Sequence, residues 1–258
     1  MTTYRIPNSS KVYKQYDSRW GYLPYPTKNS TLAGSGCGDC AVCHCAMEVD
    51  GQSGYTPKTT YKFMKQYAVA GHGTKWVGIL EGLKHFGLQN VREVDTMSEL
   101  FQLMKKGNVV AVLLFNNRRG GSRNILWTSG GHYVAAVGMK TDGKETYLYT
   151  KDSGGRGHDG WYGYNSSIRG AVSKIWVGTV PRKGIKLPSR GYFKDGDKGE
   201  NVLILQKWLN DVGFDCGKED GIYGKLTMAG VKKFQRKYGL KVDGLWGKEC
   251  QKKYLALK

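Results

Sequence analysis

The sequence predicts a mixed α+β domain followed by a small, entirely helical domain. A helical pattern at 38–49 precedes strand patterns at 109–115, 132–140, 145–152 and 173–180, and a helix set before a run of strands is typical of an α+β fold. The segment 180–200 is rich in glycine and charge and holds two of the six prolines, which is linker composition. We therefore expect an α+β domain at 1–180, a linker at 181–196 and a second domain at 197–258.

The elements of the first domain follow from their apolar patterns. The stretch "GDCAVCHCAMEV" is helical by length, and "SELFQLMKKG" predicts an amphipathic helix that ends at Gly107. The uniformly apolar "VVAVLLF" predicts a buried strand. Two further strands, "HYVAAVGMK" and "ETYLYTKD", are joined by a turn at 141–144, and "SKIWVGTV" is the last strand. These elements predict an early helix packed on an antiparallel sheet.

The tail alternates helical spacing with two glycine turns. Val202, Leu205, Trp208 and Leu209 mark one face of a helix that ends near Gly213. A second helical face contains Val231, Phe234 and Tyr238. The turns "EDGIYGKLT" and "KVDGLWGKE" repeat one pattern, an Asp-Gly pair, an apolar residue, an aromatic residue and a glycine before a short helix. We expect a compact three-helix unit.

Composition excludes several function classes. The 258 residues carry 40 Lys and Arg against 21 Asp and Glu, a formal net charge of +19 that favours polyanionic partners. Zinc-finger spacing, a basic helix leading into heptads and an aromatic RNP motif are all missing, so we expect no nucleic-acid partner. The sequence has no run of 18 apolar residues and begins without an apolar export leader, so we expect no membrane insertion and no signal peptide. A monomer is assumed.

Four of the six cysteines, Cys37, Cys40, Cys43 and Cys45, lie within nine positions. Two CxxC spacings are compatible with zinc or an iron–sulfur cluster, but four ligands this close on one helix converge only if the helix unwinds. A redox pair would follow a strand of a βαβ unit, which this region lacks. We therefore favour a nucleophile without a metal. Cys37 begins the helix, whose positive end favours thiolate, and the other three are interpreted as packing residues.

A thiolate hydrolase also needs a base, an orienting group and oxyanion donors. His132 opens a strand after two glycines, and Asp152 ends the next strand, where a hairpin returns it beside His132. The Gln15 side-chain amide is a candidate oxyanion donor together with the Cys37 backbone N–H. Gly36 and Gly131, beside the nucleophile and the base, leave room for substrate. Asp39 suits the helix dipole, although its charge opposes a nearby thiolate.

Two parts of the chain resemble known families. Residues 197–258, with "LQKWLND", "DGIYG", "VKKFQRKYGL" and "VDGLWG", resemble the type-1 peptidoglycan-binding domain, which implies wall-glycopeptide contacts for Tyr223 and Trp246 unless they pack the turns. Residues 11–180, with "YKQYDSRW", "GSGCGDCAVCHCAM", "GGHYVAAVGM" and "YTKDSGG", resemble papain-like cysteine peptidases of the bacteriocin-leader-processing, double-glycine peptidase-like branch.

The papain-like resemblance implies Cys37 as nucleophile, His132 as base, Asp152 as orienting group and Gln15 as oxyanion donor. The chain departs from stand-alone relatives at Asp39, where proline is usual, and at Ser153, which follows Asp152 in place of proline. The triad is intact, but these departures weaken any inference about the substrate.

Together the two resemblances imply an endolysin-like peptidoglycan hydrolase that needs no cofactor and cleaves an amide bond in the peptide part of the wall. Its partners would be peptidoglycan and anionic wall polymers, and an endolysin stays in the host bacterial cytoplasm until a holin opens the membrane. Two alternatives stay open. They are a zinc-dependent muramoyl-alanine amidase, with ligands from His72, His85, His132 and cysteines, and a wall-binding protein without catalysis.

Overall fold

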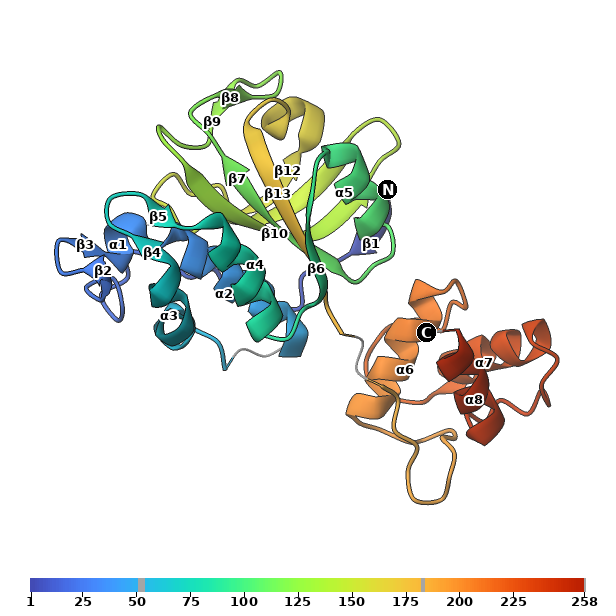
Figure 1. Ribbon diagram of the computed structural model, residues 1–258. Helices are drawn as coiled ribbons and strands as arrows, with labels where there is room; N and C mark the ends of the chain where they lie inside the picture. The colour runs from blue at the N-terminus through green and yellow to red at the C-terminus, as the bar shows by residue number, and fades with distance from the viewer. Residues whose placement is uncertain (51–53, 182–183, 258) are drawn as a thin grey trace. The chain divides into compact units, whose positions relative to one another are not determined.

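The computed structural model describes residues 1–50, 54–181 and 184–257 and divides the chain into two compact units, Met1–Pro181 and Arg182–Lys258. The first unit combines helices with an antiparallel sheet, and the second is helical (Figure 1). The predicted mixed α+β architecture is confirmed. Across the described ranges, every helix is too short or too polar to cross a membrane.

A seven-stranded antiparallel sheet forms the centre of the first unit. Its hydrogen-bonded order is β12-β11-β10-β7-β13-β6, with β1 paired to β10 outside this path. The strands are β1 (Thr2–Arg5), β6 (Gln89–Val94), β7 (Val109–Phe115), β10 (His132–Thr141), β11 (Thr146–Lys151), β12 (Gly160–Gly163) and β13 (Val172–Thr179). The strand β7 is uniformly apolar and the centres of β10 and β13 are buried, because both faces of the sheet are covered there.

Alternate side chains of the sheet enter two separate cores. Val110, Val112 and Tyr133 pack with α2 (Cys37–Asp50) and α4 (Trp76–His85), and α3 (Pro57–Met64) lies beside them (Figure 1). Ala111 and Val134 face the opposite core, which α5 (Met97–Met104) covers. The α2 helix is therefore pinned across the centre of β10, and its N-terminal Cys37 lies at one end of that strand.

Short elements complete the first unit. They are the strand pairs β2 (Pro24–Thr27) and β3 (Ser30–Thr31), β4 (Ala68–Val69) and β5 (Gly73–Thr74), and β8 (Arg119–Gly120) and β9 (Ile125–Leu126), the helix α1 (Leu32–Ser35), the 3₁₀ turn η1 (Lys65–Tyr67) and the π-helical turn η2 (Tyr164–Ile168). Of these, α1 leads directly into Cys37, and the β4–β5 hairpin packs against the same end of α2.

The second unit contains α6 (Glu200–Asp211), α7 (Lys225–Lys237) and α8 (Lys248–Ala256). Its two turns repeat in structure as well as in sequence. Gln206 donates to the Asp220 carboxylate at 3.1 Å and accepts the Gly221 N–H at 2.8 Å. In the second turn, Gln235 makes the equivalent bonds to Asp243 and Gly244, both at 2.9 Å. Gly221 and Gly244 have φ of +74° and +76°, which explains the glycine in each turn.

The segment 181–196 is not simply the linker that its composition predicted. Ile185 and Phe193 are buried in the core of the second unit. The Phe193 and Trp246 backbones exchange two hydrogen bonds, with N to O distances of 3.0 and 3.1 Å. Proline and glycine composition identified an irregular chain, but the apolar side chains within it anchor that chain to the helices.

Candidate active site

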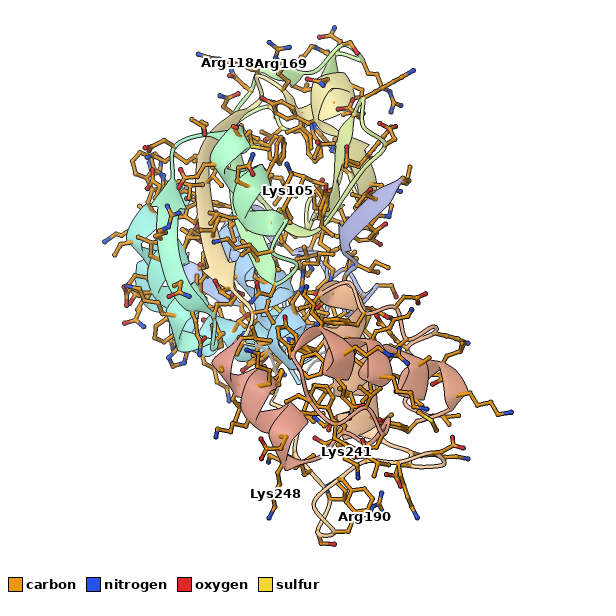
Figure 2. All side chains as sticks on the ribbon, turned by 90° about the vertical axis from the view of Figure 1, so that its right-hand side faces the viewer. Lys105, Arg118, Arg169, Arg190, Lys241 and Lys248 are labelled. Carbon is orange, nitrogen blue, oxygen red and sulfur yellow. The ribbon has the colours of Figure 1, made fainter. Side chains whose placement is uncertain are left out.

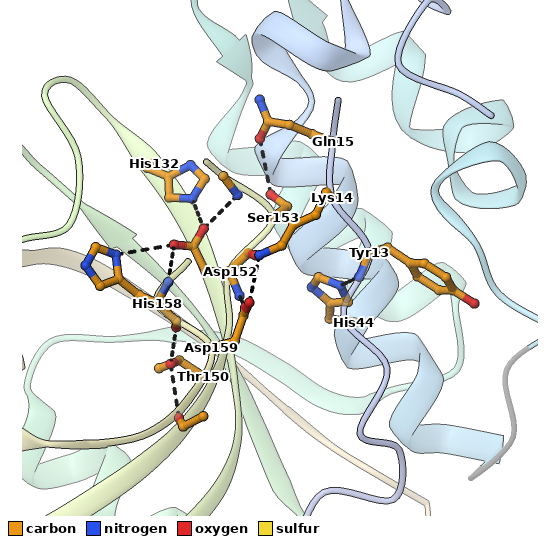
Figure 3. Close-up of polar contacts among 12 residues, drawn as sticks. Tyr13, Lys14, Gln15, His44, His132, Thr150, Asp152, Ser153, His158 and Asp159 are labelled. Atoms are coloured by element: carbon orange, nitrogen blue, oxygen red, sulfur yellow. Dashed lines mark hydrogen bonds and ion pairs between the residues drawn. The ribbon is translucent and has the colours of Figure 1, made fainter. Parts of the chain in front are cut away.

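Cys37, His132 and Asp152 come together at one end of β10. Cys37 is the first residue of α2, His132 is the first residue of β10, and Asp152 directly follows β11. The hairpin register pairs Ala135 with Lys151, so the end of β11 runs back beside His132. The His132 Nε2 atom lies 2.6 Å from Asp152 Oδ1 (Figure 3). The His132 side chain also acts on the Cys37 thiol, through a hydrogen bond and through its charge. Sequence reasoning predicted this juxtaposition.

The electrostatics of the site favour a thiolate and an imidazolium. Burial raises the pKa of the Cys37 thiol, but the hydrogen bond and charge of His132, together with backbone N–H groups of Tyr133 and Gly38, lower it by more. Burial lowers the pKa of His132, yet hydrogen bonds to Asp152 and Cys37 raise it to about 10. Burial likewise opposes ionisation of Asp152, but the hydrogen bonds from His132 and His158 give that carboxyl a lowered pKa.

The other cysteines of the cluster have the opposite environment. Cys40, Cys43 and Cys45 are fully buried in α2, and burial raises the pKa of each thiol above its usual value. Neighbouring carboxyl groups raise these pKa values further, those of Cys40 and Cys43 through Asp39 and that of Cys45 through Glu48. Within the described residues all six cysteines are free thiols. Only Cys37 in this cluster has a lowered pKa, so it alone is prepared as a nucleophile.

Gln15 links the segment before Cys37 to the loop after Asp152. Its Nε2 atom donates to the Ala33 carbonyl at 2.7 Å. Its Oε1 accepts from the Ser153 hydroxyl at 3.2 Å (Figure 3). The Gln15 backbone N–H also donates to the Ser153 carbonyl. An amide nitrogen carries two hydrogens, and one of them is committed to Ala33. The oxyanion role that we predicted for Gln15 therefore relies on the second hydrogen.

The two glycines expected to admit substrate differ. Gly131 is exposed, and a Cβ placed there meets only Leu114, at 4.0 Å, so the approach to His132 is open. Gly36 is buried, and a Cβ there lies 2.5 Å from the Leu32 side chain. The turn between α1 and α2 therefore requires a glycine at position 36 for internal packing, and the substrate contact of Gly36 stays a prediction.

Asp39 does not act on Cys37 as its sequence position suggested. Its side chain is fully buried in the first turn of α2. Burial raises the pKa of this carboxyl well above its usual value, and neither carboxyl oxygen has a hydrogen-bond partner among the described residues. Burial therefore disfavours the charged form of Asp39, which is the form expected to oppose the Cys37 thiolate.

A hollow of about 310 Å³ lies beside the nucleophile helix. Its lining comes from the β4–β5 hairpin and the start of α4, namely Val69, His72, Thr74, Lys75, Trp76 and Val77. A Cβ at Gly38 would lie 2.3 Å from Thr74 Oγ1, so the wall of the hollow touches the residue after Cys37. Trp76 is 55% exposed, and Lys174 Nζ lies 4.4 Å from the centre of its ring. Sequence reasoning gave Trp76 no role.

The histidines considered as zinc ligands are dispersed. His132 is bonded to Asp152, His85 stacks on Phe63 with ring centroids 3.8 Å apart, and exposed His72 lies in the β4–β5 turn. Throughout the described ranges, no group of three or more His, Cys, Asp and Glu side chains is arranged to hold a metal ion. The structure therefore does not bring together the donor set of the zinc-amidase alternative.

Tyr223 and Trp246 fill the core of the second unit. Both are 0% exposed, and the Tyr223 hydroxyl donates to the Gly244 carbonyl at 2.8 Å. The Trp246 indole N–H donates to Gln251 at 3.0 Å. The prediction that these side chains contact wall glycopeptide is corrected, because both are turned inward to join the two repeated turns. Packing was the alternative that the sequence left open.

Comparisons with known proteins identify the second unit. Residues 198–253 match the family described as "Putative peptidoglycan binding domain". The chain is 38% identical over 73 residues to a spore cortex-lytic enzyme of Bacillus cereus, covering 28% of each protein. It is 43% identical over 51 residues to an N-acetylmuramoyl-L-alanine amidase of Mycobacterium tuberculosis, covering 20% of this chain and 13% of the amidase. The chain thus spans less than a third of the length of either relative.

One solved structure resembles a larger part of the chain. It is a putative C39-like peptidase from Bacillus anthracis, with 11% identity, a TM-score of 0.42, and coverage of 68% of this chain and 96% of the other. At that TM-score and identity the resemblance assigns nothing to the first unit. The family that these comparisons do show is that of residues 198–253, which form a putative peptidoglycan-binding domain.

Proposed function

We propose that the protein is a peptidoglycan hydrolase of the endolysin type, which acts from the host cytoplasm after a holin opens the membrane and cleaves a peptide amide by a Cys-His-Asp mechanism. The observation that carries the proposal is that Cys37 alone in its cluster has a lowered pKa and meets a histidine held by a buried carboxylate. The peptidoglycan-binding domain in the same chain supports the substrate class. The endolysin setting rests on resemblance.

The geometry supports a two-step reaction. The Cys37 thiolate attacks an amide carbonyl, and the Gln15 amide and backbone N–H groups at the start of α2 stabilise the tetrahedral oxyanion. The His132 imidazolium then gives its proton to the leaving amine, which departs and leaves a thioester on Cys37. Neutral His132 next takes a proton from water, whose oxygen attacks the thioester and releases the carboxylic acid and the thiolate. Asp152 keeps its charge and orients His132 throughout.

The test is selective alkylation of the intact protein with iodoacetamide. Cys37 is 8% exposed, whereas the other five cysteines are at most 3% exposed, so we expect a single carboxamidomethyl group at Cys37 near neutral pH. Loss of turbidity of Gram-positive cell walls should fall in proportion to labelling, and mass spectrometry of the released fragments identifies the cleaved bond. Undiminished wall lysis by fully alkylated protein would refute the mechanism, whereas a chelator is expected to have no effect.

The same experiment has a defined pH dependence. Because the pKa of His132 is raised to about 10, its imidazolium persists through neutral pH and is lost as pH rises through about 10. Wall lysis should therefore fall at that pH, since protonation of the leaving amine requires the imidazolium. Alkylation of Cys37 should not fall there, because it requires only the thiolate. A parallel decline of lysis and labelling would contradict the assignment of His132 as the acid.

Anionic wall polymers are the second partner in the proposal. Exposed cations project from the first unit at Lys105, Arg118 and Arg169, and from the second at Arg190, Lys241 and Lys248 (Figure 2). Attraction between exposed charges is screened when salt shortens the Debye length from about 10 Å at 0.1 M to about 3 Å at 1 M. We expect binding of the Cys37→Ala variant to intact walls to weaken severalfold over this range. Walls stripped of anionic polymers should show a smaller salt effect, and equal salt effects on both walls would exclude the polymers as partners.

A further inference from the structure

Asp152 lies between two histidines, of which the reaction described above uses only one. His132 Nε2 contacts Oδ1, and His158 Nδ1 lies 3.4 Å from Oδ2 (Figure 3). Nδ1 is near enough to Oδ2 for an ion pair but is not placed for a hydrogen bond, whereas the His158 backbone N–H donates to Oδ2 at 3.2 Å. The side chains of Asp152 and His158 are 1% and 14% exposed. Within the sequence, His158 is only one residue of a glycine-rich stretch, "GGRGHDG".

The His158 ring is fixed from several sides. Its centroid lies 4.7 Å from that of Trp127 and 5.8 Å from that of Tyr162, which meets it edge to face. The His158 carbonyl accepts a hydrogen bond from the Thr150 hydroxyl at 2.6 Å. A phenyl ring would make the same aromatic contacts with Trp127 and Tyr162. Packing alone therefore does not explain why Nδ1 of His158 faces the buried Asp152 carboxylate.

The loop that carries His158 is closed onto Asp152 by charged groups. The Asp152 backbone N–H donates to Asp159 Oδ1 at 2.8 Å (Figure 3). Lys14 Nζ bridges Asp159 Oδ2 at 2.7 Å and the Asp152 carbonyl at 2.6 Å. Every polar atom of Asp152 therefore has a partner, and the partner that Oδ2 has through a side chain is His158.

We infer that His158 is a positioning residue, which holds the second carboxylate oxygen of Asp152 so that the first stays aligned with His132. Without the His158 ring, only the backbone N–H of residue 158 still holds Oδ2, so the carboxylate is fixed less firmly and a buried oxygen loses a polar contact. His132 then loses the fixed orientation of the carboxylate that supports its imidazolium. The inference rests on the proposed function for its effect on catalysis, but its effect on Cys37 is measurable without wall lysis.

Other charged and titratable groups act on the same pair and set the background of a pH measurement. They are Lys14 of the N-terminal segment, His44 of α2, His132 of β10, Asp159 of the loop and Tyr162 of β12. Arg123 of the β8–β9 turn acts on Tyr162. Substituting His158 leaves all of them in place. A change in the pH profile of Cys37 therefore reports on the contact between the His158 ring and Asp152 that is removed.

The test compares two substitutions of His158 in the full chain. His158→Phe keeps an aromatic ring between Trp127 and Tyr162 but removes the donor, whereas His158→Asn keeps an amide nitrogen near the position of Nδ1. We expect His158→Phe to lower kcat/KM for wall lysis about tenfold through kcat. It should also move the pH midpoint of Cys37 alkylation upward. His158→Asn should restore most of both, and His85→Phe, which replaces a histidine that stacks on Phe63, should change neither.

The outcomes separate the inference from the proposed function. An unchanged alkylation profile in His158→Phe would overturn the positioning role, and so would an equal loss in His158→Asn. If the alkylation midpoint moves as expected while wild-type protein releases no wall fragments, the positioning role stands and the proposed function fails. Protection of the buried thiols of Cys40, Cys43 and Cys45 from alkylation shows in each case that the variant is folded.

Discussion

Cys37→Ala should abolish wall hydrolysis while leaving wall binding intact. Removing the nucleophile of a triad costs about 10⁶ in kcat in the best-measured case, and the members of a triad act as a unit. His132→Ala should therefore be comparably inactive, and the double variant no worse than either single one. Binding should survive because residues 198–253, with their own buried core, lie in the other compact unit. Turbidity of purified walls measures hydrolysis, and co-sedimentation with walls measures binding.

The cysteine cluster itself supplies the control for this experiment. Cys43 lies on the same helix, is fully buried and has a pKa raised well above its usual value. Cys43→Ala removes one buried sulfur atom and should cost only the stability of a small core deletion, about 1 kcal/mol. Its lytic rate should match that of wild type at a temperature where both are folded. If Cys43→Ala were as inactive as Cys37→Ala, the cluster would act as a group and a single nucleophile would be the wrong description.

The sequence predicts the strands that have a clear local pattern, and it does not predict those that form only by pairing with distant strands. The strands β7, β10 and β13 follow from apolar stretches, because both faces of this sheet are covered, and β11 follows from its aromatic and β-branched residues. The first strand, "TTYR", has no such run, and it forms because Arg5 reaches the buried Glu48 and pairs its backbone with β10. The strand β12, "GWYG", is bounded by glycines and owes its pairing to β11. Local patterns contain none of this information.

The same distinction holds for the residues of the candidate site, some of which meet through local pairing and others through distant contacts. His132 and Asp152 are neighbours because a short hairpin joins their strands, so residue spacing alone predicts that they meet. His158 reaches Asp152 only because the loop is closed by Lys14, which is 138 residues away from Asp152. The only sequence signal was a histidine and an aspartate placed a few residues after Asp152. Similarly, an aromatic residue in a glycine turn is equally suited to a core or a surface. Tyr223 and Trp246 are buried, and the Tyr223 hydroxyl of the first turn bonds to Gly244 of the second, a contact that neither turn's own sequence predicts.

Glu48→Gln should destabilise the first unit by about 3–5 kcal/mol, the largest stability effect that we predict. Glu48 is fully buried in α2 and holds two cations, Arg5 at 2.8 Å and Lys151 at 3.0 Å. It also accepts the Asn8 backbone N–H at 2.7 Å. Glutamine fills the same volume but supplies no charge, so both cations stay buried without compensation. Breaking such a pair costs far more than its net contribution to folding, because the remaining charges cannot return to water.

The measurement is the urea concentration at which Cys40, Cys43 and Cys45 become reactive to a thiol reagent, which reports on the first unit alone. A loss of this size corresponds to a decrease of about 2 M in the midpoint. Glu99→Gln is the matched control, since Glu99 pairs with Arg92 at 2.7 Å but is 38% exposed, and exposed pairs contribute about 0–1 kcal/mol. Equal midpoints for the two variants would show that the cations around Glu48 find other partners.

Because Lys151 directly precedes Asp152, the same ion pair fixes the end of β11. Glu48→Gln should therefore also slow alkylation of Cys37 in the folded protein, whereas Glu99→Gln should leave it unchanged.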